Sequence, residues 1–152
     1  MDLEQSISYI NQQTKDSKRC KELFDTNTIL RISNLLKRTS FDDSIKVYCS
    51  EIINNYLEYS FTKGLKGESL ENCSYVIKNI DTSHELKSEA LRSILLTAEK
   101  EKFLPEEVIH SLVNNLDNFD KKSANFVIMT LGTICEKSEI ENINKISNKL
   151  LD

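Results

Sequence analysis

The chain has 152 residues, of which 39% are hydrophobic and 29% charged, with only three glycines and one proline. So little glycine and proline excludes a turn-rich, all-β fold and leaves no flexible linker, so we expect a single all-α domain over residues 1–152. The formal net charge of −4 argues against nucleic-acid binding driven by a surplus of cations.

The four cysteines are widely spaced and form no C-x-x-C pair. Cys20, Cys49, Cys73 and Cys135 stand at or beside apolar helical positions, where a free thiol behaves as a small hydrophobe. No apolar run approaches the roughly 18 residues of a membrane span, and the N-terminus lacks the layout of a signal peptide. We therefore expect reduced core cysteines in a cytoplasmic protein without membrane contact, metal or cofactor. A disulfide or a metal site is the alternative for these thiols.

Residues 1–25 are predicted to form N-terminal capping helices. Apolar residues recur at helical spacing over residues 3–10, and a second short apolar stretch covers residues 16–24. A polar cluster then breaks the chain, and Thr26 or Asn27 is expected to cap the next helix.

One pattern then occurs three times: a short apolar helix, a polar elbow, and a longer apolar helix. Shifting the first copy by about 41 residues aligns Ile45-Lys46 with Leu86-Lys87, and a shift of about 36 residues relates the second copy to the third. Self-similarity at this period is typical of stacked helix pairs, each burying its apolar face against the next. The copies run over residues 29–61, 70–103 and 108–137, within a repeat region that covers residues 27–137.

Local signals mark where these helices begin and end. Ser40 and Thr82 are each followed three residues later by an acid, which predicts capping boxes. Gly64 is expected to end a helix in the left-handed conformation. Pro105, followed by two glutamates, is expected at the first helical position of the third copy. Residues 138–152, which open with another capping box, are predicted to form a C-terminal capping helix.

Apolar residues at helical spacing define the expected core. Val47 and Tyr48 have high β propensity but keep the helical spacing of their surroundings, so no strand is predicted. The inner stripes of the three longer helices are expected to be Ile45, Cys49, Ile52, Ile53, Tyr56 and Leu57; Leu86, Ala90, Leu91, Ile94, Leu95 and Ala98; and Ala124, Val127, Ile128, Leu131 and Ile134.

Helix pairs at this period, with a more apolar second helix and an Asn/Asp-rich elbow, resemble HEAT or armadillo-type repeats over roughly residues 27–137. The chain departs from the HEAT pattern because it lacks the usual first-helix proline and the elbow arginine. The resemblance implies a right-handed α-solenoid of about three antiparallel helix pairs with capping helices at both ends. It also implies a scaffold that binds a protein on its concave face, although a few relatives bind nucleic acid.

The residues offer no clear catalytic constellation. The two histidines, His84 and His110, lie in separate predicted helices, without the Cys and His spacings of a zinc site. Paired acids such as Asp42-Asp43 lie in first turns, where they favour the helix dipole. The chain is therefore expected not to be an enzyme; a hydrolase with an unrecognised site is the alternative.

Polar and exposed residues of the longer helices are the candidate partner contacts. Tyr59 and Phe61 are the best hot-spot candidates, because aromatic side chains are enriched in interface cores. Lys87, Asn54, Thr97 and Met129 also fall outside the expected apolar stripes. The expected partner-binding residues are Lys46, Asn55, Glu58, Tyr59, Arg92, Glu99, Asn125 and Thr133.

The leading functional hypothesis is a non-enzymatic protein–protein interaction module, a small helical-repeat scaffold that binds a protein partner. A narrower hypothesis suits the size and acidity of the chain: an inhibitor or immunity protein that neutralises a basic toxin or effector. The alternative is a nucleic-acid-binding repeat protein of the DNA-repair type, which requires a basic groove. The sequence predicts no oligomeric state.

Overall fold

The computed structural model describes residues 2–60, 63–79 and 81–135, and every regular element within these ranges is a helix. Val47 and Tyr48 lie inside a helix, and the predicted all-α class is confirmed. The α-helices are α1 (Leu3–Gln13), α2 (Ser17–Leu23), α3 (Thr26–Asn34), α4 (Asp43–Tyr59), α5 (Gly67–Lys78), α6 (His84–Glu101), α7 (Glu106–Asn114) and α8 (Lys121–Cys135). Two short 3₁₀ helices, η1 (Leu35–Lys37) and η2 (Leu116–Asn118), follow α3 and α7.

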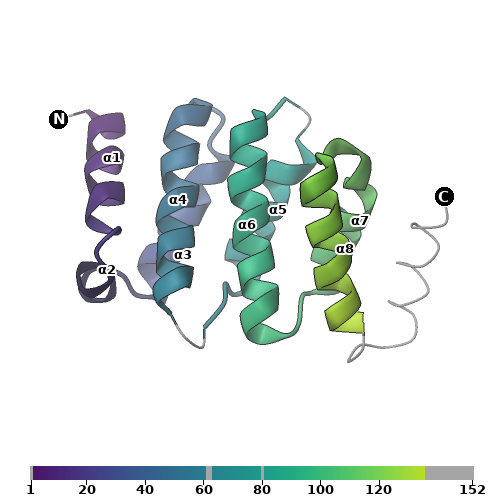
Figure 1. Ribbon diagram of the computed structural model, residues 1–152. Helices are drawn as coiled ribbons and strands as arrows, with labels where there is room; N and C mark the ends of the chain where they lie inside the picture. The colour runs from purple at the N-terminus through teal and green to yellow at the C-terminus, as the bar shows by residue number, and fades with distance from the viewer. Residues whose placement is uncertain (1, 61–62, 80, 136–152) are drawn as a thin grey trace.

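The helices form two layers (Figure 1). Helices α1, α4, α6 and α8 stand side by side in a front row, in which α4 contacts both α1 and α6, and α6 contacts α8. Helices α3, α5 and α7 form the row behind, where α5 contacts both of its neighbours. Contacts of α3 with α4 and of α5 with α6 join the two rows. From α3 onward, the chain therefore alternates between the back row and the front row.

The helices of the front row run in the same direction. At the beginnings of α4 and α6, the backbone N–H of Ser83 donates to Asp43 Oδ2 over 2.7 Å. At their ends, the ammonium group of Lys100 donates to the carbonyl oxygen of Ser60. Helix α1 runs the same way, because Glu4 contacts Ser44 near the start of α4 and Lys15 contacts Tyr59 at its end, and the colours of Figure 1 show that α8 does too. The starts of these four helices therefore lie along one edge of the protein and their ends along the other.

The core lies between the two rows. Ile94, Ile52 and Leu131, all predicted for the inner stripes, are fully buried. Leu95 was predicted for the same stripe, but it is only half-buried at the edge of the core. The largest fully buried side chains are Leu36, Ile52, Ile53, Leu57, Ile77, Leu86, Ile94, Leu104, Val108, Leu112, Val127 and Leu131.

Three of the four cysteines belong to this core. Cys20 on α2, Cys49 on α4 and Cys73 on α5 are buried and free. Burial raises the pKa of the Cys49 and Cys73 thiols to about 12, because a thiolate there would lose its hydration. The prediction of core thiols is confirmed at these three positions, while the side chain of Cys135 lies outside the described part.

Three predicted helix caps are wrong by one or two residues. The capping residues are Asp25, Asp42 and Ser83, in place of Thr26 or Asn27, Ser40 and Thr82. Each has an extended backbone, and its side-chain oxygen accepts a hydrogen bond from the backbone N–H three residues later. Thr26 cannot serve as the cap because it is itself the first residue of α3.

Two further start and stop predictions need correction. Pro105 precedes the first helical residue of α7 by one position. Helix α4 ends at Tyr59, and Gly64 does not adopt the left-handed conformation, which Lys102 adopts at the end of α6. Gly64 instead packs against α6, where a Cβ atom would lie 2.7 Å from Thr97 Cγ2. The predicted helix at 138–152 and the hot-spot candidate Phe61 lie outside the described residues.

Candidate protein-binding face

The residues predicted to bind a partner all lie on helices of the front row. The structure thus brings together, on neighbouring helices, side chains that are far apart in the sequence. Lys46, Asn55, Glu58 and Tyr59 lie on α4, Arg92 and Glu99 on α6, and Asn125 and Thr133 on α8.

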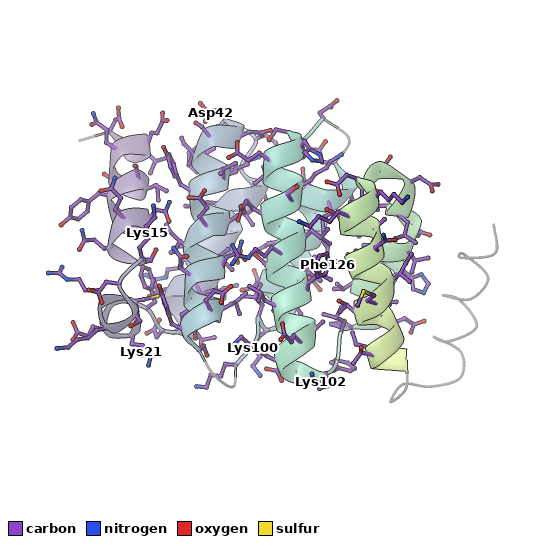
Figure 2. All side chains as sticks on the ribbon, viewed as in Figure 1. Lys15, Lys21, Asp42, Lys100, Lys102 and Phe126 are labelled. Carbon is purple, nitrogen blue, oxygen red and sulfur yellow. The ribbon has the colours of Figure 1, made fainter. Side chains whose placement is uncertain are left out.

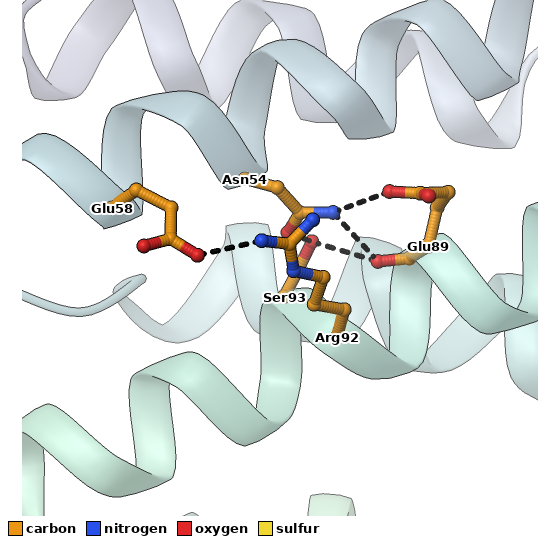
Figure 3. Close-up of polar contacts among 5 residues, drawn as sticks. All are labelled: Asn54, Glu58, Glu89, Arg92 and Ser93. Atoms are coloured by element: carbon orange, nitrogen blue, oxygen red, sulfur yellow. Dashed lines mark hydrogen bonds and ion pairs between the residues drawn. The ribbon is translucent and has the colours of Figure 1, made fainter. Parts of the chain in front are cut away.

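A buried asparagine joins α4 to α6 beneath this face (Figure 3). Asn54 is 1% exposed. Its Nδ2 donates to the carbonyl oxygen of Glu89 over 3.1 Å and to Glu89 Oε2 over 2.8 Å, and its Oδ1 accepts from Ser93 Oγ over 2.6 Å. Since both ends of the amide are bonded, this residue fixes how the two helices are aligned. Asn54 and the equally buried Thr97 were expected on the surface, and that expectation is wrong.

An exposed ion pair lies beside Asn54. Arg92 Nη2 on α6 is 2.6 Å from Glu58 Oε1 on α4 (Figure 3). Both side chains are about half exposed, so water screens the pair and its contribution to stability is small. Arg92 and Glu58 are therefore accessible to a partner.

Two other predicted contacts are engaged inside the protein. Asn55 Nδ2 donates to Thr14 Oγ1 over 2.9 Å, and the Tyr59 hydroxyl donates to the carbonyl oxygen of Lys15 over 2.8 Å. Both side chains are half-buried. They tie α4 to the end of α1 and the turn after it, so Tyr59 has a structural role, and its role as a hot spot stays a prediction.

A groove between α6 and α8 contains three of the predicted residues, Arg92, Glu99 and Thr133. It has a volume of about 550 Å³. Its large apolar lining residues are Leu91, Leu95 and Leu96 on α6 and Phe126, Met129 and Ile134 on α8, and these six residues define the α6–α8 groove.

Two residues of the groove are exposed although they are large and apolar. Phe126 is 53% and Met129 70% exposed, and Figure 2 shows Phe126 lying at the gap between α6 and α8. Sequence reasoning did not select Phe126. The available signal was its position, because Phe126 falls outside the apolar stripe of α8 that contains Val127 and Leu131.

Acids lie along the front face from α1 to α8: Glu51 bonds to Asn11 on α1, Glu58 and Glu89 make contacts between α4 and α6, and Glu99 lines the α6–α8 groove. Asn11 and Asn54 donate hydrogen bonds to Glu51 and Glu89, but neutral amides do not cancel the carboxylate charge. Lys46 and Lys87 lie near the starts of α4 and α6, and Lys100 lies near the end of α6. We call the surface formed by Glu51, Glu58, Glu89, Glu99 and Arg92 the acidic seam.

The histidines lie apart from the groove. His84, the first residue of α6, has its Nε2 3.5 Å from Asp120 Oδ2, and His110 on α7 has its Nε2 3.5 Å from Glu106 Oε1. The histidine at position 110 therefore belongs to the back row. Within the residues that the structure describes, no three His, Cys, Asp or Glu side chains gather as metal ligands.

Neither a family model nor a curated protein nor a solved structure matches this chain, so its function is inferred from the residues of the front face. Among the described helices, none has the length and apolar character required to cross a bilayer.

Proposed function

We propose that this chain is a non-enzymatic protein-binding module that uses the surface of α4, α6 and α8. The observation that carries the proposal is the α6–α8 groove, where the exposed Phe126 and Met129 lie beside Arg92 and Glu99. Apolar side chains next to polar and arginine side chains are the usual composition of an interface core. Most of the exposed surface elsewhere on these helices is polar.

We further infer a right-handed solenoid of the HEAT or armadillo type. In this description α3–α4, α5–α6 and α7–α8 are three antiparallel pairs, α1–α2 and residues 138–152 are the caps, and the front row is the concave side. Lateral hydrogen bonds support a repeat of this length, because they join residues about one period apart. Ser33 to Asn72 in the back row and Asn54 to Ser93 in the front row each span 39 residues.

The acidic seam favours a basic partner, and this is the feature that supports an inhibitor or immunity protein. Complementary charge raises the association rate and selects against acidic competitors. The free, buried thiols of Cys20, Cys49 and Cys73 favour a reducing compartment, which supports the cytoplasm as the location.

Nucleic-acid binding is the alternative, and the observation in its favour is a set of lysines at one edge. Figure 2 shows Lys100 and Lys102 at the end of α6, Lys15 just after α1, and Lys21 on α2. Cations at helix C-termini also complement the helix dipole, and Glu99 and Glu101 lie among them. The protein partner is therefore the favoured reading.

The proposal is tested by affinity capture from the native host, followed by binding measurements with charge-reversal variants. Glu99→Lys on the front face should weaken binding of the captured protein by about fivefold or more, with a larger effect at low salt. The matched control is Glu107→Lys, an exposed glutamate of α7 in the back row. Weakening by the control alone would place the interface on the back row. Capture of nucleic acid without protein would support the alternative function.

A further inference from the structure

The α6–α8 groove is an apolar site within a polar face. Leu95 and Leu96 are half-buried on its α6 side, and Phe126 and Met129 are largely exposed on its α8 side. The free energy falls when another apolar surface covers large apolar side chains that are exposed to water. The groove therefore favours an occupant with an apolar face of its own.

The walls of the groove restrict the backbone of that occupant. In the middle turns of α6 and α8, the backbone N–H and C=O groups bond within the helix, so the walls present side chains only. An extended segment buried there would leave its own amide groups without partners, which is costly. A helix pairs its backbone groups internally, so the groove is suited to a helix.

The length of α8 sets the size of this helix. Helix α8 covers Lys121–Cys135, which corresponds to about 22 Å at the rise of an α-helix. A partner helix of about four turns matches that length, with apolar residues at positions i, i+3, i+4 and i+7 toward the groove.

The acidic seam determines which charge is favoured on one flank of the bound helix. Glu99 lines the groove and also belongs to the seam, so a helix seated on Leu95 and Phe126 has one side next to the seam. Lys102 also lines the groove, at the end of α6, whereas Arg92 pairs with Glu58 and leaves the charge of Glu89 uncompensated by that contact. Lysine or arginine on the adjoining flank of the helix would complement the carboxylates of the acidic seam.

We propose that the α6–α8 groove binds an amphipathic helix of a basic protein partner. The apolar side of that helix covers Phe126, Met129 and Leu95, and its basic flank faces the acidic seam. This inference rests on the proposed protein-binding function and specifies the segment that is bound.

The test uses three synthetic peptides of about 15 residues and the whole protein. The first is a helix with a leucine stripe and lysines on the polar side, the second has glutamates in place of the lysines, and the third is the first in scrambled order. Fluorescence anisotropy should show that the basic helix binds about tenfold or more tightly than the other two. Equal binding of the three peptides, or no binding of the basic helix, would overturn the proposal.

Matched serine variants locate the binding site. Phe126→Ser and Met129→Ser should each weaken binding of the basic peptide by about tenfold, the usual scale for an anchor residue. Phe103→Ser is the control, because Phe103 is 62% exposed and does not line the groove. Circular dichroism checks that each variant keeps its helical content. Unchanged binding by Phe126→Ser and Met129→Ser would show that the peptide binds elsewhere.

Three further outcomes separate this proposal from its alternatives. A dimer in sedimentation that Phe126→Ser dissociates would identify a second copy of the chain as the occupant, and the proposal would be wrong. If Glu99→Lys weakens binding of the captured partner and Met129→Ser does not, the groove is not the binding site, and the proposed protein-binding function still holds. If neither variant weakens binding of the partner, both the proposed function of the front face and the proposed role of the groove are wrong.

Discussion

Ile94 and Leu95 are sequence neighbours in different environments. Both fit the apolar spacing of α6, because a stripe facing a core is wide enough to include adjacent positions. Successive helical residues nevertheless point about 100° apart. Ile94 is therefore fully buried between the rows, while Leu95 is half-buried beside the α6–α8 groove.

This difference should appear as a difference in stability. Ile94→Ala should lower the free energy of unfolding by about 2–5 kcal/mol, because it removes buried apolar surface and leaves a cavity. Leu95→Ala should cost nearer to about 1 kcal/mol, since the vacated space opens onto the groove. Urea denaturation of the two variants measures both values. A larger loss for Leu95→Ala would contradict the burial that separates the two residues.

At the scale of the element, three helices of the front row begin with the same kind of N-terminal cap. Asp2, Asp42 and Ser83 cap α1, α4 and α6 through side-chain oxygens that accept backbone N–H bonds. The carboxylates also lie at the positive ends of the helix dipoles. The pKa of Asp42 is lowered from its ordinary value of 3.8, first by a hydrogen bond from the Ser44 hydroxyl and then by the backbone N–H of Ile45.

This lowered pKa predicts a pH dependence of stability. A carboxylate with a lower pKa in the folded state stabilises the protein above the ordinary aspartate pKa, and that contribution is lost as the pH falls through the folded value. Asp42→Asn removes the titration and keeps a capping side chain. The difference in stability between wild type and Asp42→Asn should therefore shrink between about pH 7 and about pH 2.5 in urea melts.

The control is Asp117→Asn, an exposed carboxylate in η2 that does not cap an α-helix. If the free energies of unfolding of wild type and Asp42→Asn differ by the same amount over the whole pH range, the Asp42 carboxylate does not stabilise α4 through its charge.

At the scale of the whole molecule, the layers bury one thiol in each of three helices. Cys49 and Cys73 lie on α4 and α5, within the long central helices, whereas Cys20 lies on the seven-residue α2 at the N-terminal end. A terminal helix with one covered side opens more readily than helices between two neighbours. The reactivity of the three thiols therefore reports which helices open locally and which open only when the whole protein unfolds.

Thiol modification should follow this order. In a Cys135→Ser background, a maleimide reagent should modify Cys20 first and Cys49 and Cys73 only with global unfolding, because burial raises the pKa of the latter two to about 12 and excludes the reagent. Mass spectrometry after timed labelling at increasing urea concentration measures the order. Rapid modification of Cys73 without urea would show that α5 is not held in the core.

The sequence by itself determined the all-α class, the order of the helices and most of the core, because helical spacing and scarce glycine and proline are local properties. It also selected Arg92, Glu99 and Thr133 as candidate contacts, and the structure places these three residues on the groove. The tertiary structure alone decided that Asn54 and Thr97 are buried, that Tyr59 bonds to Lys15, and that Phe126 and Met129 border a groove. Those outcomes depend on which helix lies beside each face, and a periodic pattern gives the direction of a side chain without naming its neighbour.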